Sequence, residues 1–160
     1  MKNKEIKSAI NRLVRIADRG EIARLRCYQT FTLRTKAYPV LGDIGFLGVH
    51  WLSEVASMWA VNQNHKYETG NLGAVLRKTS MSHPTIRAQF ENILASDRLG
   101  AIGWIGGIMS MVDGIDYVEL ATDLLFWGDD TKLKWAKSFW TKPQDDQEPS
   151  TATKEDPIHE

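Results

Sequence analysis

The chain has 160 residues, a size that suits one domain or two small lobes with a buried core, and 42% of its residues are hydrophobic. Its formal net charge is zero, and its one cysteine, Cys27, excludes an internal disulfide framework and favours a reducing compartment. The N-terminal segment MKNKEIK lacks the apolar core of a signal peptide, and the longest uncharged run, residues 99–112, is shorter than the roughly 20 residues that a membrane span needs. We therefore expect a soluble, cytoplasmic protein without a membrane contact.

The zero net charge hides an uneven distribution along the chain. Residues 1–36 hold ten Lys or Arg against three Asp or Glu, whereas residues 141–160 hold six acids against two Lys. A local basic field of this kind attracts phosphate groups. Charges that only solvate helix faces would give the same pattern, so charge alone leaves both interpretations open.

Two helices are predicted in the basic N-terminal part. Residues 4–19 place apolar side chains on one side of a helix, and Gly20 is expected to end it. A second helix is expected to start over residues 21–26, and the Thr-rich segment 30–36 favours an irregular loop. Such a loop can lie against a nucleic-acid backbone and stack on bases, although core packing of its aromatic residues is an equally open interpretation. The residues concerned are Arg34 and Lys36, beside Tyr28, Phe31 and Tyr38.

Residues 46–62 show the strongest helical pattern in the sequence. Apolar residues from Leu47 to Trp59 recur at three- and four-residue spacing, which predicts a core helix. We interpret its Trp and Met residues as packing residues rather than as ligands. The polar segment 62–69 is expected to connect an N-terminal lobe to a C-terminal lobe.

Two further helical patterns, within residues 70–98, flank a predicted loop at residues 77–83. Pro84 suits the first turn of the second helix, where its missing amide is tolerated, and Ser82 or His83 is expected to cap it. This helix is expected to end near Asp97. The polar side of this stretch is weakly basic. Its four cations are Arg77, Lys78, Arg87 and Arg98.

The C-terminal part predicts a glycine-rich apolar segment and two amphipathic helices. Glycines 100, 103 and 107 fall roughly on one face, which would let a neighbouring helix approach closely. Asp116 and Glu119 are expected to form a reciprocal cap for the next helix, which Gly128 ends. The last helix is expected to open at Asp130 or Thr131. Its predicted inward residues are Trp135, Phe139 and Trp140, and its outward residues are Lys134 and Lys137.

Together these patterns predict an all-α protein with no sheet, built from two small bundle-like helical lobes. The predicted N-terminal lobe covers residues 1–64 and the C-terminal lobe residues 65–140. Residues 141–160 are rich in Pro, Gln, Ser, Thr and acids without apolar periodicity, which predicts a disordered acidic tail.

No pattern typical of an active site or a cofactor site is present in the sequence. The histidines at positions 50, 65, 83 and 159 lack metal-ligand spacing, and Cys27 has no histidine partner in sequence. Serines occur without a nucleophile elbow, and no Walker or G-x-G-x-x-G pattern is present. We therefore expect no metal, no cofactor and no enzymatic activity.

Several segments, taken in order, resemble one known family. The run LGAVLRKTSMSHPTIRAQFENILASDR, then IDYVELATDLLFWG, then KLKWAKSFW resembles the CasB family, the small subunit of the type I-E CRISPR Cascade surveillance complex. The segment GEIARLRC followed by KAYPVL is similar to that family's Leu-Arg-Arg segment and the Pro-Ala-Phe-Tyr helix after it. The resemblance covers nearly all of residues 5–140.

The resemblance implies an all-helical, non-enzymatic subunit with basic contact surfaces. Its implied partners are crRNA and target DNA, the backbone and large subunits of Cascade, and a second copy of itself, with no membrane. Basic positions of the family fall on Arg26, with Arg24 close by, and on Arg87 and Arg98. Local charge adds further candidates, so the full predicted nucleic-acid-binding set is Arg24, Arg26, Arg34, Lys36, Arg77, Lys78, Arg87, Arg98, Lys132, Lys134 and Lys137.

The chain departs from the family at two places. Gly106 and Gly107 stand where relatives often carry paired arginines, and Asp129 and Asp130 stand where relatives can carry basic residues. Either nearby lysines of the last helix make these contacts instead, or the subunit binds its nucleic-acid strand more weakly. A helical protein-interaction module that does not bind nucleic acid directly is the alternative function.

Overall fold

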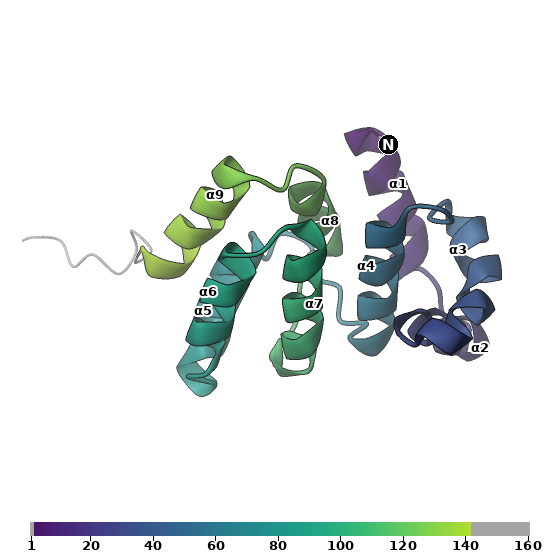
Figure 1. Ribbon diagram of the computed structural model, residues 1–160, viewed down its shortest axis with the longest axis horizontal. Helices are drawn as coiled ribbons and strands as arrows, with labels where there is room; N and C mark the ends of the chain where they lie inside the picture. Colours follow the sequence, from purple (N-terminus) through teal and green to yellow (C-terminus); the bar gives the residue numbers. More distant parts are fainter. Residues whose placement is uncertain (1, 142–160) are drawn as a thin grey trace, which may run out of the picture.

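The computed structural model describes residues 2–141, which form helices joined by short connections and 3-10 turns (Figure 1). No strand occurs in this range, only one isolated bridge between His65 and Ile115, so the all-α prediction is confirmed. None of its helices has the length and apolar character to cross a bilayer. Beyond Thr141, the predicted acidic tail lies outside the described residues. The helices are α1 (Asn3–Val14), α2 (Arg19–Arg26), α3 (Tyr38–Ile44), α4 (His50–Val61), α5 (Leu72–Ser82), α6 (Ile86–Leu94), α7 (Arg98–Ile108), α8 (Tyr117–Leu125) and α9 (Asp129–Trp140), with 3-10 turns η1 (Cys27–Gln29), η2 (Phe31–Ala37) and η3 (Met109–Met111).

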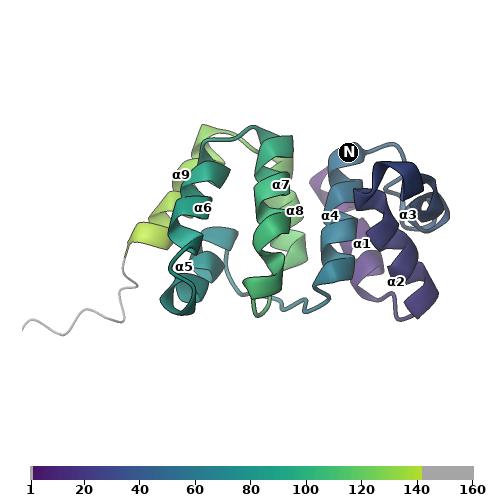
Figure 2. The ribbon, with the colours of Figure 1, turned by 60° about the horizontal axis from the view of Figure 1, so that its bottom comes forward.

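The helices stand side by side in an elongated row (Figures 1 and 2). Helices α5, α6 and α9 form one end, α7 and α8 lie in the middle, and α1 to α4 form the other end. Helix α1 packs against α8 and α4 packs against α7, so the buried apolar residues of both halves belong to one cluster. The division into lobes at residue 64 stays a prediction.

The first two helices have different boundaries from those predicted. Helix α1 ends at Val14, and α2 already begins at Arg19. The carboxylate of Asp18 caps α2 by accepting a hydrogen bond from the Glu21 amide at 2.9 Å. Gly20 therefore lies in the first turn of α2 and does not end the helix before it.

The segment predicted as an irregular loop is the 3-10 turn η2. The helix predicted from residue 46 begins only at His50, because Gly45 and Gly48 both adopt a left-handed conformation with φ of 85°. Leu47 lies between these glycines and is 53% exposed. The prediction that Leu47 packs in the core is therefore wrong. Beyond His50 the predicted core helix is confirmed, with Met58 and Trp59 buried.

Helix α5 runs through to Ser82, so the loop predicted at residues 77–83 is largely helical. Helix α6 begins only at Ile86, which leaves Pro84 in the preceding turn. Helix α6 ends at Leu94, near Asp97 as predicted, and the Asp97 carboxylate caps α7 by accepting from the Gly100 amide at 2.8 Å. The loop and the start of α6 were misassigned because polar residues that can cap one helix can also belong to the last turn of another, and spacing alone does not separate these cases.

The prediction that a neighbouring helix closely approaches the glycines of α7 is wrong. A Cβ added at Gly103 or Gly107 would meet nothing within 4 Å, so this face of α7 is open. The close approach occurs instead at Gly73 in α5, where an added Cβ would lie 2.1 Å from the Trp135 carbonyl oxygen. Glycine at position 73 therefore sets the distance between α5 and α9.

The polar connector after α4 is held by hydrogen bonds from both ends. The Asn62 side-chain amide donates to the carbonyls of Met109 and Val112 at 2.8 and 2.9 Å. Asp116 caps α8 as predicted, accepting from two amides of its first turn. The cap is not reciprocal, because the Asp116 amide donates to the Thr69 hydroxyl, at 3.1 Å, and not to Glu119.

We expect His65 in this connector to make stability depend on pH. Burial lowers the pKa of His65, against the opposing effect of Asp116, and its Nδ1 accepts a hydrogen bond from the Tyr117 amide at 3.2 Å. Because the folded-state pKa lies below the unfolded value of about 6.5, the stabilisation is complete above that pH. It is lost as the pH falls through the folded-state pKa.

Urea unfolding at pH 7.5 and pH 5 measures this effect. The His65→Gln variant, which keeps an acceptor for Tyr117 but does not titrate, is expected to lose less stability than the wild type over that interval. Equal losses in the two proteins would contradict the prediction.

Candidate nucleic-acid interface

Two of the predicted arginines in the N-terminal half donate through Nε to backbone carbonyls. Arg26 Nε donates to the Ala60 carbonyl at 2.9 Å, which ties α2 to the end of α4. Arg34 Nε donates to the Tyr28 carbonyl at 3.0 Å, and its guanidinium lies 4.6 Å from the centre of the Tyr28 ring and 3.9 Å from Glu54. Both side chains therefore hold parts of the fold together.

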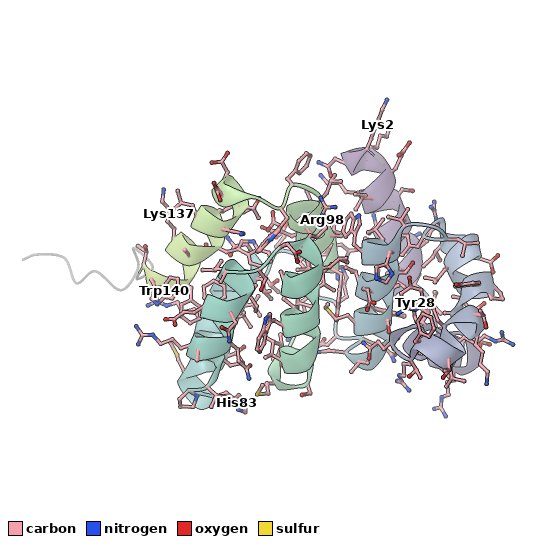
Figure 3. The ribbon with its side chains drawn as sticks, in the orientation of Figure 1. Lys2, Tyr28, His83, Arg98, Lys137 and Trp140 are labelled. Carbon is pink, nitrogen blue, oxygen red and sulfur yellow. The ribbon has the colours of Figure 1, made fainter. Side chains whose placement is uncertain are left out.

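Arg77 and Arg98 have the same kind of role in the C-terminal half. Arg98 begins α7 in the middle of the molecule (Figure 3), and its Nε and Nη2 donate to the last two carbonyls of α8 at 2.7 and 3.0 Å. Its guanidinium also lies 5.2 Å from the Trp51 ring centre. Arg77 Nη1 donates to the carbonyls of Phe139 and Thr141 at 3.3 and 2.5 Å. A cation suits these positions, because the last carbonyls of a helix lack intrahelical donors and carry partial negative charge.

The three lysines of α9 have different surroundings. Lys134 pairs with Asp123, a carboxylate that is 5% exposed and also accepts from the Trp135 indole at 2.8 Å. Lys132 lies over the Trp127 ring, 5.6 Å from its centre. Lys137 is exposed on the outer side of α9 (Figure 3) and forms no ion pair within residues 2–141. Of the three, Lys137 is best placed to meet a phosphate.

Arg24 and Lys36 lie together on the surface. Arg24 Nη1 donates to the Lys36 carbonyl at 3.3 Å, which joins α2 to η2, and both side chains are exposed. Neither forms an ion pair with an acid in the described part of the chain. Phe31 of η2 is 82% exposed and lies under the Arg34 guanidinium, 5.5 Å from ring centre to cation. We call Arg24, Lys36 and Phe31 the α2–η2 patch.

Tyr28 belongs to the interior and not to this patch. It is buried, and its hydroxyl is 2.6 Å from His50 Nδ1. Burial raises the pKa of Tyr28, so its hydroxyl stays protonated at neutral pH. Of the three aromatic residues considered for base stacking, Tyr28 therefore packs in the core, whereas Phe31 and Tyr38 are exposed.

Lys78 and Arg87, the last two candidates, line separate depressions. Lys78 faces a pocket of about 410 Å³ that Glu68 and Asp113 also line. Arg87 lines a groove at the end of α9 beside Trp140. Trp140 was predicted to face inward, whereas its side chain is 42% exposed. The buried stripe of α9 runs through Thr131, Trp135 and Phe139, and Trp140 lies beside it.

Within residues 2–141, no group of three or more His, Cys, Asp or Glu side chains is arranged to hold a metal ion. Residues 2–141 define a class of protein: an all-helical protein in which several arginines bind carbonyls of neighbouring elements and other cations lie exposed on the surface.

The chain belongs to the Cse2 family of CRISPR-associated proteins, because residues 49–140, more than half of its length, match the family model described as CRISPR-associated protein Cse2. The predicted relationship to CasB is thereby confirmed, and family membership implies a CRISPR-associated subunit of a Cascade complex. No curated protein showed a significant match to the chain.

Two crystal structures from Thermus thermophilus share this fold. A CRISPR-associated protein of the Cse2 family superposes with a TM-score of 0.71 at 19% identity. A protein named CasB superposes with a TM-score of 0.69, also at 19% identity. Each alignment covers 86% of this chain and 97% of the other chain. At this level of identity the likeness concerns the fold alone.

Proposed function

We propose that this chain is the non-catalytic small subunit of a type I-E CRISPR surveillance complex, present there in two copies. It contacts crRNA and target DNA through phosphate groups and stabilises the R-loop and its displaced strand. Family membership supports the assignment to such a complex. The observation that supports direct nucleic-acid contact is the α2–η2 patch, where Arg24 and Lys36 are exposed side by side without an acidic partner in the described range.

The patch suits a backbone contact because its two cations can neutralise neighbouring phosphates and release their counterions. Lys78, Arg87 and Lys137 are exposed cations that can add to such a contact elsewhere on the surface. Arg34, Arg77 and Arg98 contribute mainly by holding the helices that carry these side chains, since they are only partly exposed and their guanidinium groups already donate to carbonyls. Arg26 is exposed and, like Arg24, donates to one carbonyl, so it can add to the phosphate contact as well.

The Arg24→Ala/Lys36→Ala double variant tests this function in the assembled complex. Because each lost phosphate contact lowers the salt slope by about one, we expect R-loop formation to weaken and its dependence on log salt to fall by about two. Electrophoretic mobility shifts over a salt series measure both quantities.

The matched control is Lys4→Ala/Lys7→Ala, which removes two exposed cations from α1. We expect it to keep the slope of the wild-type complex. A slope in the Arg24→Ala/Lys36→Ala complex equal to that of the wild type would rule out contact at the α2–η2 patch.

The alternative function is a helical protein-interaction module. It is favoured by Tyr38 and Leu47, two exposed apolar side chains that line a surface depression of about 310 Å³. If this alternative is right, Tyr38→Ser/Leu47→Ser will release the subunit from the complex, whereas Arg24→Ala/Lys36→Ala will leave both assembly and target binding unchanged.

A further inference from the structure

A groove of about 530 Å³ lies where the end of α9 meets α5 and the start of α6. It is at the opposite end of the molecule from Tyr28 and the helices that carry the α2–η2 patch (Figure 3). This volume lies within the range of about 300–1,000 Å³ that is usual for small-ligand sites. We call it the α5–α9 groove; its lining includes Arg77, Met81, Pro84, Arg87, Phe139 and Trp140.

Trp140 gives the groove a rigid aromatic wall. Its ring centre lies 5.3 Å from that of Phe90 and 5.0 Å from that of Phe139, in tilted and edge-on arrangements. These two contacts hold the indole in place, yet the side chain remains 42% exposed. A fixed, partly exposed indole loses little conformational entropy when a flat ligand stacks on it.

The charge of the groove is positive. Arg77 is anchored at its wall by the carbonyls of Phe139 and Thr141, and Arg87 is exposed on α6. None of the described residues that line the groove carries a carboxylate, in contrast to the pocket beside Lys78. Arginine beside an exposed aromatic ring is the combination that binds single-stranded nucleic acid, through its phosphates and its bases respectively.

We propose that the α5–α9 groove binds one unstacked nucleotide of a single-stranded nucleic acid, with the base against Trp140 and Met81 and the phosphate beside Arg87. This inference rests on the proposed function and adds base stacking to the backbone contact of the α2–η2 patch. The stacking is tolerant of sequence, because every base has a π face. A strand bound at both sites would run along the length of the helix row.

Two labelled single strands of equal length and charge test the proposal, one of thymidine nucleotides and one with abasic sugars throughout. Binding to the full-length protein at low salt is measured by fluorescence anisotropy. We expect the wild type to bind the thymidine strand at least about five-fold more tightly, and Trp140→Ala to bind both strands equally. The matched control is Trp104→Ala, which removes a 43% exposed Trp from α7 and is expected to keep the preference.

Met81→Glu keeps the test decisive if Trp140→Ala proves unstable. Met81 is 76% exposed, so a glutamate there will not disturb folding but will place a negative charge in the groove. We expect this variant to lose the preference for bases as well. A wild type that binds the two strands equally, or a preference that survives both groove variants, would overturn the proposal.

The same measurements separate this inference from the proposed function. Arg24→Ala/Lys36→Ala should weaken binding of both strands and leave the preference for bases intact. If that variant binds both strands like the wild type, the proposed function fails, while the base preference of the groove is still measured by Trp140→Ala.

An acidic peptide is the competing occupant of the groove. Its test is the binding of a peptide of residues 142–160 to a chain ending at Thr141. If the peptide binds, Met81→Glu abolishes that binding and the wild type shows no base preference, the groove is a peptide site and the proposal is overturned.

Discussion

Replacing Gly73 with alanine is expected to destabilise the protein by about 3 kcal/mol, since filling a close-packed contact costs up to about that amount when the backbone must move. The added Cβ would lie 2.1 Å from the carbonyl oxygen of Trp135 and 2.8 Å from its carbonyl carbon, so α5 and α9 must separate. For a protein of this size the melting temperature should fall by about 6–12 °C. Differential scanning calorimetry measures the change.

Gly103→Ala is the matched control. Gly103 lies on the open face of α7, where an added Cβ meets nothing within 4 Å. Because alanine favours a helix over glycine by up to about 1 kcal/mol, this variant should equal or exceed the stability of the wild type. If Gly73→Ala melts like Gly103→Ala, the close approach of α5 and α9 does not limit stability.

Replacing Arg98 with alanine is expected to lower the free energy of unfolding by about 2 kcal/mol, because hydrogen bonds from a charged donor are worth about 1.5–3 kcal/mol each and this side chain is only partly buried. Two carbonyls at the end of α8 lose their donor, and Trp51 loses the cation over its ring. Urea unfolding measures the loss. Arg98→Lys should recover part of it, since one ammonium can reach a carbonyl but lacks the planar geometry that serves two.

Arg87→Ala is the informative comparison, because Arg87 matches the family in the same way but is exposed on α6. It should change stability by less than about 0.5 kcal/mol, as surface substitutions usually do, while weakening nucleic-acid binding. The Arg26→Ala/Arg98→Ala variant, which the family resemblance predicts to weaken R-loop formation in a folded subunit, is expected from these hydrogen bonds to lose stability as well. If the Arg98→Ala protein is as stable as the wild type, the Arg98 side chain does not stabilise the fold, and its role is in nucleic-acid binding alone.

Helix boundaries show where sequence reasoning failed. The apolar spacing predicted that helices exist across the chain, but it extended the first to residue 19 and began the fourth at residue 46. The structure ends the first helix at Val14 and begins the fourth at His50. Asp18 and the left-handed glycines Gly45 and Gly48 explain both errors, because a cap or a turn is decided by one backbone conformation rather than by periodicity.

The sequence by itself determined the helical class, the cap at Asp116 and, through the order of its motifs, the family. Each of these follows from residue spacing or residue type along the chain. Only the tertiary structure decided which cations remain available at the surface. Arg26 and Arg98 find their carbonyl partners 34 and 26 residues away in sequence, because the end of a helix has carbonyls without donors and folding brings an arginine to them. Arg24, Arg26 and Lys36 keep exposed side chains, and Trp140 is exposed because it lies beside the buried stripe of α9 that ends at Phe139.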